Sequence, residues 1–130
     1  MEDIRKLIPQ DKHDHERARA AIHAGYPAVE AILPELLVWL QDINWPVAQT
    51  LAPFLASIGE PLIPHLRAIF ETDDEIWKGW VISCVVEDSP PLALAFREYL
   101  ERVADNPTQN EIDEYVAVLA RDVLEKNGWR

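Results

Sequence analysis

The sequence predicts an all-α protein, built as a compact HEAT-like α-solenoid of about three helical hairpins with an extra N-terminal helix. Apolar residues recur at helical spacing between turns marked by glycine and proline, and no segment shows sustained period-two alternation. Residues 42–47 (DINWPV) have a degenerate echo at residues 73–78 (DDEIWK), and each copy lies between two apolar helical runs. An internal period of roughly 20 to 50 residues is typical of stacked helix pairs.

The N-terminal part contains two predicted elements and then the first hairpin. A short turn is expected over residues 4–8 and a helix over residues 14–24, which Gly25 ends. The first hairpin then joins a helix over residues 29–40 to one over residues 47–58. Their apolar stripes are Val29, Ile32, Leu33, Leu36, Leu37 and Leu40, followed by Val47, Leu51, Phe54, Leu55 and Ile58.

Glycine and proline mark the helix ends, and two prolines fall inside helices. Gly59 lies two residues before Pro61. A glycine is suited to end one helix, and a proline is suited to the first turn of the next. Pro34 and Pro53 lie within the predicted helices of the first hairpin. Each removes a backbone hydrogen bond and clashes with the carbonyl four residues earlier, so we expect a kink at both sites.

Two further hairpins follow, and each contains a predicted capping box. The second joins apolar residues 62–70 to residues 77–85, and Thr72 with Glu75 has capping-box spacing. The third joins residues 92–103 to a last helix that begins at Thr108 with Glu111. The apolar stripe of this last helix is Ile112, Tyr115, Val116, Leu119 and Val123, and Gly128 closes it.

The sequence resembles a bacterial family of small domains of unknown function related to HEAT repeats. The Asn44-Trp45-Pro46-Val47 core carries most of the resemblance, together with Trp77-Lys78. The match covers roughly residues 4–86, about two thirds of the chain. The resemblance implies an α-solenoid without an established activity, and the third hairpin depends on periodicity alone.

Composition indicates one cytoplasmic domain over residues 1–130. A chain of 130 residues is large enough to bury a core without a disulfide or a metal. No apolar run approaches the roughly 20 residues needed to cross a bilayer. The N-terminus lacks a secretory signal, and the single cysteine, Cys84, has no partner for an internal disulfide.

Charge is the strongest compositional indication about partners. The net charge is −11, and residues 20–66 contain no lysine or arginine. An acidic surface repels phosphate backbones, so nucleic-acid binding is not expected. The same field attracts a basic protein, although net charge also serves simply to keep a protein dispersed.

The repeated corner segment supplies the candidate binding residues. In HEAT-like pairs an aspartate after the first helix commonly caps the turn into the second, and Asp42 and Asp73 match that position. This capping role is the main interpretation for both. The tryptophans are interpreted mainly as core or corner packing, with Trp39 and Trp45 expected to be partly exposed. The candidate binding residues are Asp42, Asn44, Trp45, Asp73, Asp74 and Trp77.

The sequence contains no motif for catalysis, for a cofactor or for a metal. A phosphate-binding glycine loop, a Gly-x-Ser-x-Gly elbow and a His-Glu-x-x-His pair are all missing. His13, Asp14 and His15 have metal-ligand chemistry but fall short of a closed site, so they are interpreted as surface side chains. Cys84 is interpreted as a small core side chain and not as a nucleophile.

Three functional hypotheses follow from these observations. The first is a noncatalytic protein-binding module, in a sharper form an immunity-type inhibitor of a basic partner. The second is a small-ligand or enzymatic domain that uses a carboxylate pocket between hairpins, formed by Asp42, Asp73 or Glu87. The third is an oligomeric assembly subunit. The sequence does not fix the oligomeric state.

Overall fold

The computed structural model describes residues 3–130, and in this range the chain forms nine α-helices and no strand. The helices are α1 (His15–Ala24), α2 (Leu33–Val38), α3 (Pro46–Ile58), α4 (Ile63–Phe70), α5 (Glu75–Val81), α6 (Pro90–Ala95), α7 (Arg97–Asp105), α8 (Gln109–Asp113) and α9 (Val116–Lys126). Between them lie the short 3₁₀ segments η1 (Ile4–Leu7), η2 (Glu30–Ile32), η3 (Trp39–Gln41) and η4 (Glu60–Leu62), and the π-helical segment η5 (Ile82–Val86). The all-α prediction is confirmed.

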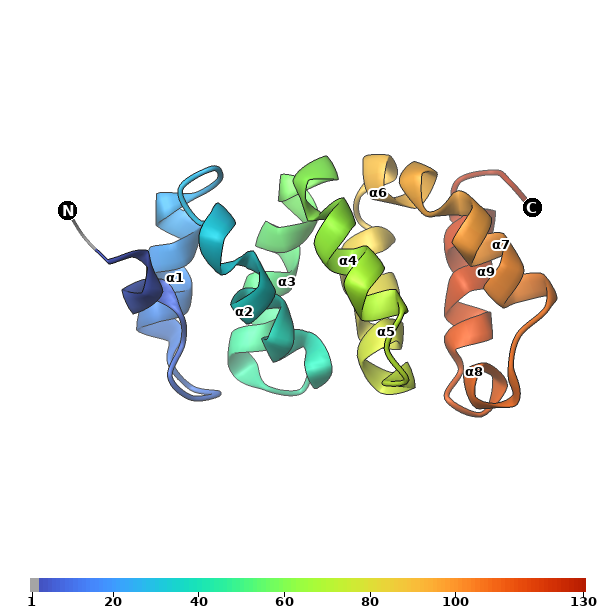
Figure 1. Ribbon diagram of the computed structural model, residues 1–130, viewed down its shortest axis with the longest axis horizontal. Helices are drawn as coiled ribbons and strands as arrows, with labels where there is room; N and C mark the ends of the chain where they lie inside the picture. The colour runs from blue at the N-terminus through green and yellow to red at the C-terminus, as the bar shows by residue number, and fades with distance from the viewer. Residues whose placement is uncertain (1–2) are drawn as a thin grey trace.

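The helices stand side by side in a row that runs from the N-terminus to the C-terminus (Figure 1). Helix α1 packs against α3, and α3 packs against η5, which continues α5. Both α5 and η5 contact α9, and α9 in turn packs against α7. The α2–α3 turn, the α4–α5 turn and α8 all lie at the same end of the helices, the lower edge in Figure 1. We call this end the corner edge.

The core follows the apolar stripes that the sequence predicts. In the first hairpin Val29, Ile32, Leu33, Leu36, Leu37 and Leu40 are all buried, and so are Val47, Leu51 and Leu55. The buried apolar residues form one cluster from α1 to α9. Each fully buried aliphatic side chain contributes about 1.5–3 kcal/mol through removal of apolar surface from water, so burial of these stripes stabilises the packing of the helices.

The predicted boundaries of the N-terminal elements and the role of the glycines are confirmed. Asp14 caps α1 by accepting the backbone N–H of Arg17. Gly25 and Gly59 end α1 and α3 with φ of 71° and 74°, in the left-handed region that favours glycine. The first proline prediction is wrong: Pro34 lies in the first turn of α2, where its missing N–H costs no helical hydrogen bond. Pro53 lies inside α3 as predicted.

The prediction of one continuous last helix is also wrong. The helix is interrupted between α8 and α9 at Tyr115, which has a φ of 63°. As a result Ile112 and Tyr115 are not core residues but are 50% and 70% exposed. The predicted capping box is present, with Thr108 and Glu111 exchanging hydrogen bonds at the start of α8. Because the Glu111 carboxylate also binds Arg102 of α7, it ties α8 to α7, and α9 starts anew after the break.

No helix within residues 3–130 combines the length and the apolar character that a membrane span requires.

Candidate functional site

The α2–α3 turn holds three of the predicted site residues, and Asp42 caps this turn as predicted, although the N-cap residue of α3 itself is Trp45. Asp42 accepts the backbone N–H of Asn44 at 2.9 Å, within the turn, and Trp45 precedes α3 without a side-chain cap. The Trp45 ring packs edge-to-face on Trp39, with centroids 5.6 Å apart, and both rings are half-buried. Asn44 is exposed. Asp42 and Trp45 therefore order this corner, and Asn44 is its freely exposed polar group.

The α4–α5 turn differs from the predicted capping box. Asp74, not Thr72, caps α5, because its carboxylate accepts the N–H of Trp77 at 3.0 Å. Thr72 instead donates to the carbonyl of Ile69 at 2.7 Å. Glu75 therefore lies in the first turn, where its carboxylate pairs with Lys78 at 3.0 Å. Asp73, predicted as a cap, is exposed and has no capping role.

Replacing Asp74 by alanine is expected to lower the free energy of unfolding by about 1 kcal/mol, because α5 loses its N-cap. The matched variant Asp73→Ala is expected to change it by less than about 0.5 kcal/mol. Urea unfolding followed by circular dichroism measures both. Equal losses in the two variants would contradict the assignment of the cap.

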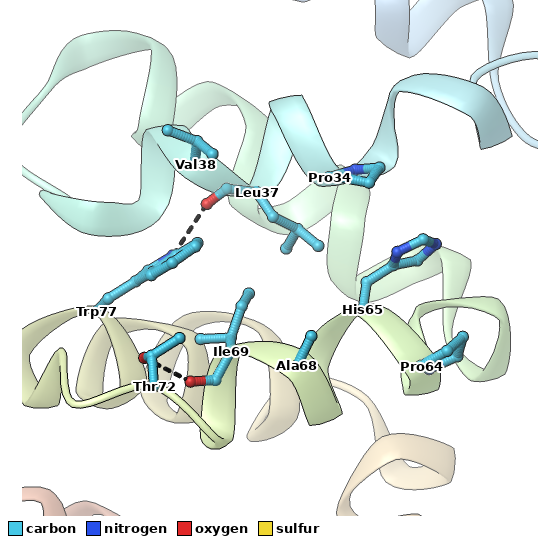
Figure 2. A pocket seen from close by; sticks show the side chains of 9 residues that line it. All are labelled: Pro34, Leu37, Val38, Pro64, His65, Ala68, Ile69, Thr72 and Trp77. Atoms are coloured by element: carbon cyan, nitrogen blue, oxygen red, sulfur yellow. Dashed lines mark hydrogen bonds between the residues drawn. The ribbon is translucent and has the colours of Figure 1, made fainter.

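Trp77 connects the first two hairpins. Its indole Nε1 donates to the backbone carbonyl of Leu37 at 3.0 Å, across from α5 to α2 (Figure 2). The ring also lines a groove between α2 and α4 with a volume of about 310 Å³, which we call the inter-hairpin groove. Its lining is Pro34, Leu37, Val38, Pro64, His65, Ala68, Ile69, Thr72 and Trp77. This lining contains no carboxylate, and His65 is its one ionisable side chain.

Asp73 and Asp74 lie in a different place, the acidic recess, which has a volume of about 460 Å³. Its lining is Asp73, Asp74, Glu75, Ile76, Asn110 and Glu114. A second hollow, the apolar recess, has a volume of about 420 Å³ and is lined by Ile76, Gly79, Trp80, Glu114, Tyr115 and Leu119. Of the predicted site residues, the structure thus brings together Asp73 and Asp74. It leaves Asp42, Asn44 and Trp45 in another turn and Trp77 in the groove.

The sequence did not reveal the residues of the apolar recess. Ile76 is 53% exposed and Tyr115 is 70% exposed, although both lie in segments with helical apolar periodicity. No glycine or asparagine occupies position 115, so the sequence gives no signal for a helix interruption there. The hydrogen bonds between Arg102 of α7 and Glu111 of α8 are contacts between distant segments that accompany it. A non-glycine residue in the left-handed region costs roughly 1–2 kcal/mol, which the packing of the flanking helices offsets.

A polar cluster lies between α5, α7 and α8. Lys78 and Glu75 form a mostly buried pair, and Arg102 binds both carboxylate oxygens of Glu111. Burial raises the pKa of the Tyr99 phenol, so this group stays protonated over the physiological range. The Tyr99 hydroxyl and Glu75 Oε2 are buried without a hydrogen-bond partner among residues 3–130. This cluster links the last hairpin to the second.

Replacing Tyr99 by phenylalanine is expected to raise the free energy of unfolding by about 1 kcal/mol, because an unsatisfied buried hydroxyl is removed. The ring would still stack on Phe70, whose centroid lies 4.5 Å away. Tyr115→Phe, at an exposed position, is the control and is expected to change stability by less than about 0.5 kcal/mol. Thermal and urea unfolding measure the difference. A loss of 1 kcal/mol or more for Tyr99→Phe would contradict this expectation.

The thiol of Cys84 and the imidazole of His15 belong to different elements, η5 and α1. Cys84 is half-buried, and burial raises the pKa of its thiol, which disfavours the nucleophilic thiolate. His15 Nδ1 lies 3.4 Å from the Thr50 hydroxyl, between α1 and α3. Over the described range, residues 3–130, no three or more His, Cys, Asp or Glu side chains are placed to hold a metal ion.

Comparison with known proteins shows the family. Residues 7–124 match the family described as a domain of unknown function, DUF5071. The chain belongs to this family. A search of curated proteins finds no match. The DUF5071 match extends beyond the residues that carry the sequence resemblance and includes the third hairpin up to Leu124, in the last turn of α9.

Proposed function

We propose that the protein is a noncatalytic protein–protein interaction module of the cytoplasm, built as a compact HEAT-like α-solenoid. The row of helix pairs, with equivalent turns along the corner edge, supports this architecture (Figure 1). Solenoids of stacked helix pairs use their extended faces for binding. The single cysteine agrees with a reducing compartment.

The observation that carries the proposal is the pair of large apolar side chains exposed beside the apolar recess. Ile76 and Tyr115 come from different helix pairs and are each more than half exposed, and Trp80 lies in the same lining. Tyrosine and tryptophan are favoured anchors at protein interfaces, because burial of their rings provides much of the binding energy.

The sharper form of the proposal is an immunity-type inhibitor of a basic partner protein. Its motivation is the net charge of −11 together with the small size of the domain. An acidic surface accelerates the association of a basic protein, and this acceleration weakens as salt is added. Co-expression tests this form: the domain is expected to restore growth of cells that express the captured basic protein.

Affinity capture from the native cell, with the full chain as bait at low and moderate salt, tests the general proposal. We expect one basic protein to be retained, more strongly at low salt. If neither salt condition retains a protein above the level of an unrelated acidic bait, the proposal fails.

The carboxylate-pocket alternative receives less support from the geometry. Asp42 and Glu87 do not line the acidic recess, which contains Asp73. Glu87 instead follows η5. Thermal-shift measurements over a panel of metabolites and metal ions test this alternative, and light scattering tests the third hypothesis, an assembly subunit. A stabilising metabolite or a self-associated species would favour the corresponding alternative.

A further inference from the structure

We propose that the acidic recess and the apolar recess form one docking surface, which binds a partner-protein segment that presents a lysine or arginine next to a large apolar side chain. This inference rests on the proposed function and names the chemistry of the partner. The two recesses are adjacent, because Ile76 and Glu114 line both of them. Together they extend over α5, α8 and the start of α9, on the corner edge and the face beside it.

The charge of this surface is one-sided. The lining of the two recesses contains four carboxylates, from Asp73, Asp74, Glu75 and Glu114, and no lysine or arginine. The nearby cation Lys78 is only 6% exposed and is paired with Glu75 at 3.0 Å. Asp73, Asp74 and Glu114 are all exposed and remain available to a cation brought by a partner.

The apolar half of the surface is suited to one large side chain. Ile76 and Tyr115 form its exposed rim, and Trp80 and Leu119 are half-buried in its lining. Gly79 lies between them, and an added Cβ would stand 3.3 Å from Leu119 Cδ1. The absence of a side chain at this position therefore lets Leu119 approach α5 closely in the lining of the recess.

The charge argues against three other occupants. A second copy of this chain docked through the same surface would bring the same carboxylates against each other, and like charges in contact cost free energy. Nucleic acids and anionic lipid surfaces carry negative charge as well. A basic residue beside an apolar anchor satisfies both halves of the surface, with the cation on the exposed carboxylates and the anchor in the apolar recess.

The first test is a titration with three defined peptides of equal length: one of lysine and leucine, one of lysine and serine, and one of glutamate and leucine. The surface variants are Ile76→Ser/Tyr115→Gly and Asp73→Asn/Glu114→Gln. Glycine suits the positive φ of residue 115, so the first variant removes the ring while relieving backbone strain. The control variant is Leu94→Ser/Glu98→Gln, because Leu94 is 63% exposed and Glu98 is exposed on another part of the molecule.

We expect the lysine–leucine peptide to bind most tightly, as measured by calorimetry and by the perturbation of amide signals of α5, α8 and α9. Ile76→Ser/Tyr115→Gly is expected to weaken binding at least about tenfold. Asp73→Asn/Glu114→Gln is expected to weaken it about fivefold at low salt and less at high salt. The control variant is expected to change it less than about twofold. Circular dichroism and urea unfolding verify that each variant is folded.

The proposal is overturned if the lysine–serine peptide binds as tightly as the lysine–leucine peptide, or if the control variant weakens binding as much as the surface variants. Binding of the glutamate–leucine peptide with equal affinity would overturn it as well. Self-association of the wild type that Ile76→Ser/Tyr115→Gly abolishes in light scattering would assign the surface to a second copy instead.

A second test separates this inference from the proposed function. The wild type and both surface variants serve as bait for the captured native partner. If wild type and variants capture the partner equally, the docking surface is wrong while the interaction function stands. If the wild type captures no partner, the interaction function fails, and the peptide titration alone decides whether the surface binds a basic apolar segment.

Discussion

Replacing Arg102 by methionine is expected to lower the free energy of unfolding at pH 7 by about 2–3 kcal/mol. The guanidinium Nη2 donates to Glu111 Oε2 at 3.0 Å, and Nη1 donates to Oε1. Glu111 is only 2% exposed. Apart from Arg102, the donor to its carboxylate is the Thr108 N–H, which lies 2.8 Å from Oε1. The variant therefore leaves Oε2 of a buried carboxylate without its donor. The Arg102 side chain is 45% exposed, which keeps the expected loss below that of a fully buried pair.

The same pair makes stability depend on acid pH. Burial alone would raise the pKa of Glu111, but the hydrogen bonds from Arg102 and Thr108 outweigh it, and the net pKa lies below the usual value of 4.5. A carboxyl with a lowered folded-state pKa stabilises the protein above its ordinary pKa, and this stabilisation is lost as the pH falls through the folded value. The wild type is therefore expected to lose stability progressively below about pH 4.5.

Urea unfolding between pH 3 and pH 7 checks this expectation, with Glu111→Gln as the matched variant. Glutamine keeps a capping side chain but does not titrate, so its stability is expected to fall less over the acid range. Some acid sensitivity should remain, because the N–H of Gln10 lowers the pKa of Asp14 in the same direction. A Glu111→Gln curve parallel to the wild-type curve would contradict the role of Glu111.

The double variant Arg102→Met/Glu111→Gln tests whether the two residues act as a pair. Its loss is expected to be smaller than the sum of the two single losses, because the second substitution removes a carboxylate that the first had left without its partner. Additive losses would mean that the contact contributes no coupling energy.

Much of the fold follows from local signals in the sequence. Gly25 and Gly59 end helices because only glycine adopts their φ easily, and the Thr108 box caps α8 through side chains three residues apart. Most residues of the apolar stripes of the first hairpin are buried as their periodicity predicts, and Phe54 and Ile58 are half-buried. All of these features depend on neighbours within a few positions along the chain.

The candidate surface depends instead on contacts between distant segments. Ile112 and Tyr115 continue an apolar stripe without interruption, yet the helix is interrupted at Tyr115 and both side chains are exposed. The apolar recess then joins Ile76 to Tyr115 across two helix pairs. The spacing of residues within one segment does not indicate which residues of two distant segments lie together. The sequence therefore indicated Asp73 and Asp74 on this surface but not the apolar half beside them.

Replacing Trp77 by alanine is expected to lower the free energy of unfolding by about 3 kcal/mol. The ring is half-buried between the first two hairpins, and its N–H bonds the Leu37 carbonyl at 3.0 Å. The substitution removes both the packing and the hydrogen bond, and it opens the inter-hairpin groove toward α5. Because η3 and α5 lie in contact, the loss is expected to loosen the junction between these hairpins first.

Trp77→Phe separates the two contributions. Phenylalanine keeps an aromatic ring but lacks the N–H, so the expected loss is about 1 kcal/mol, the value of a typical hydrogen bond. Trp80→Phe is the matched control, because the Trp80 indole makes no hydrogen bond to any of residues 3–130. Hydrogen exchange of the α2 and α5 amides locates the effect. If Trp77→Phe and Trp80→Phe lose equal stability, packing alone joins the hairpins and the bond to Leu37 contributes nothing measurable.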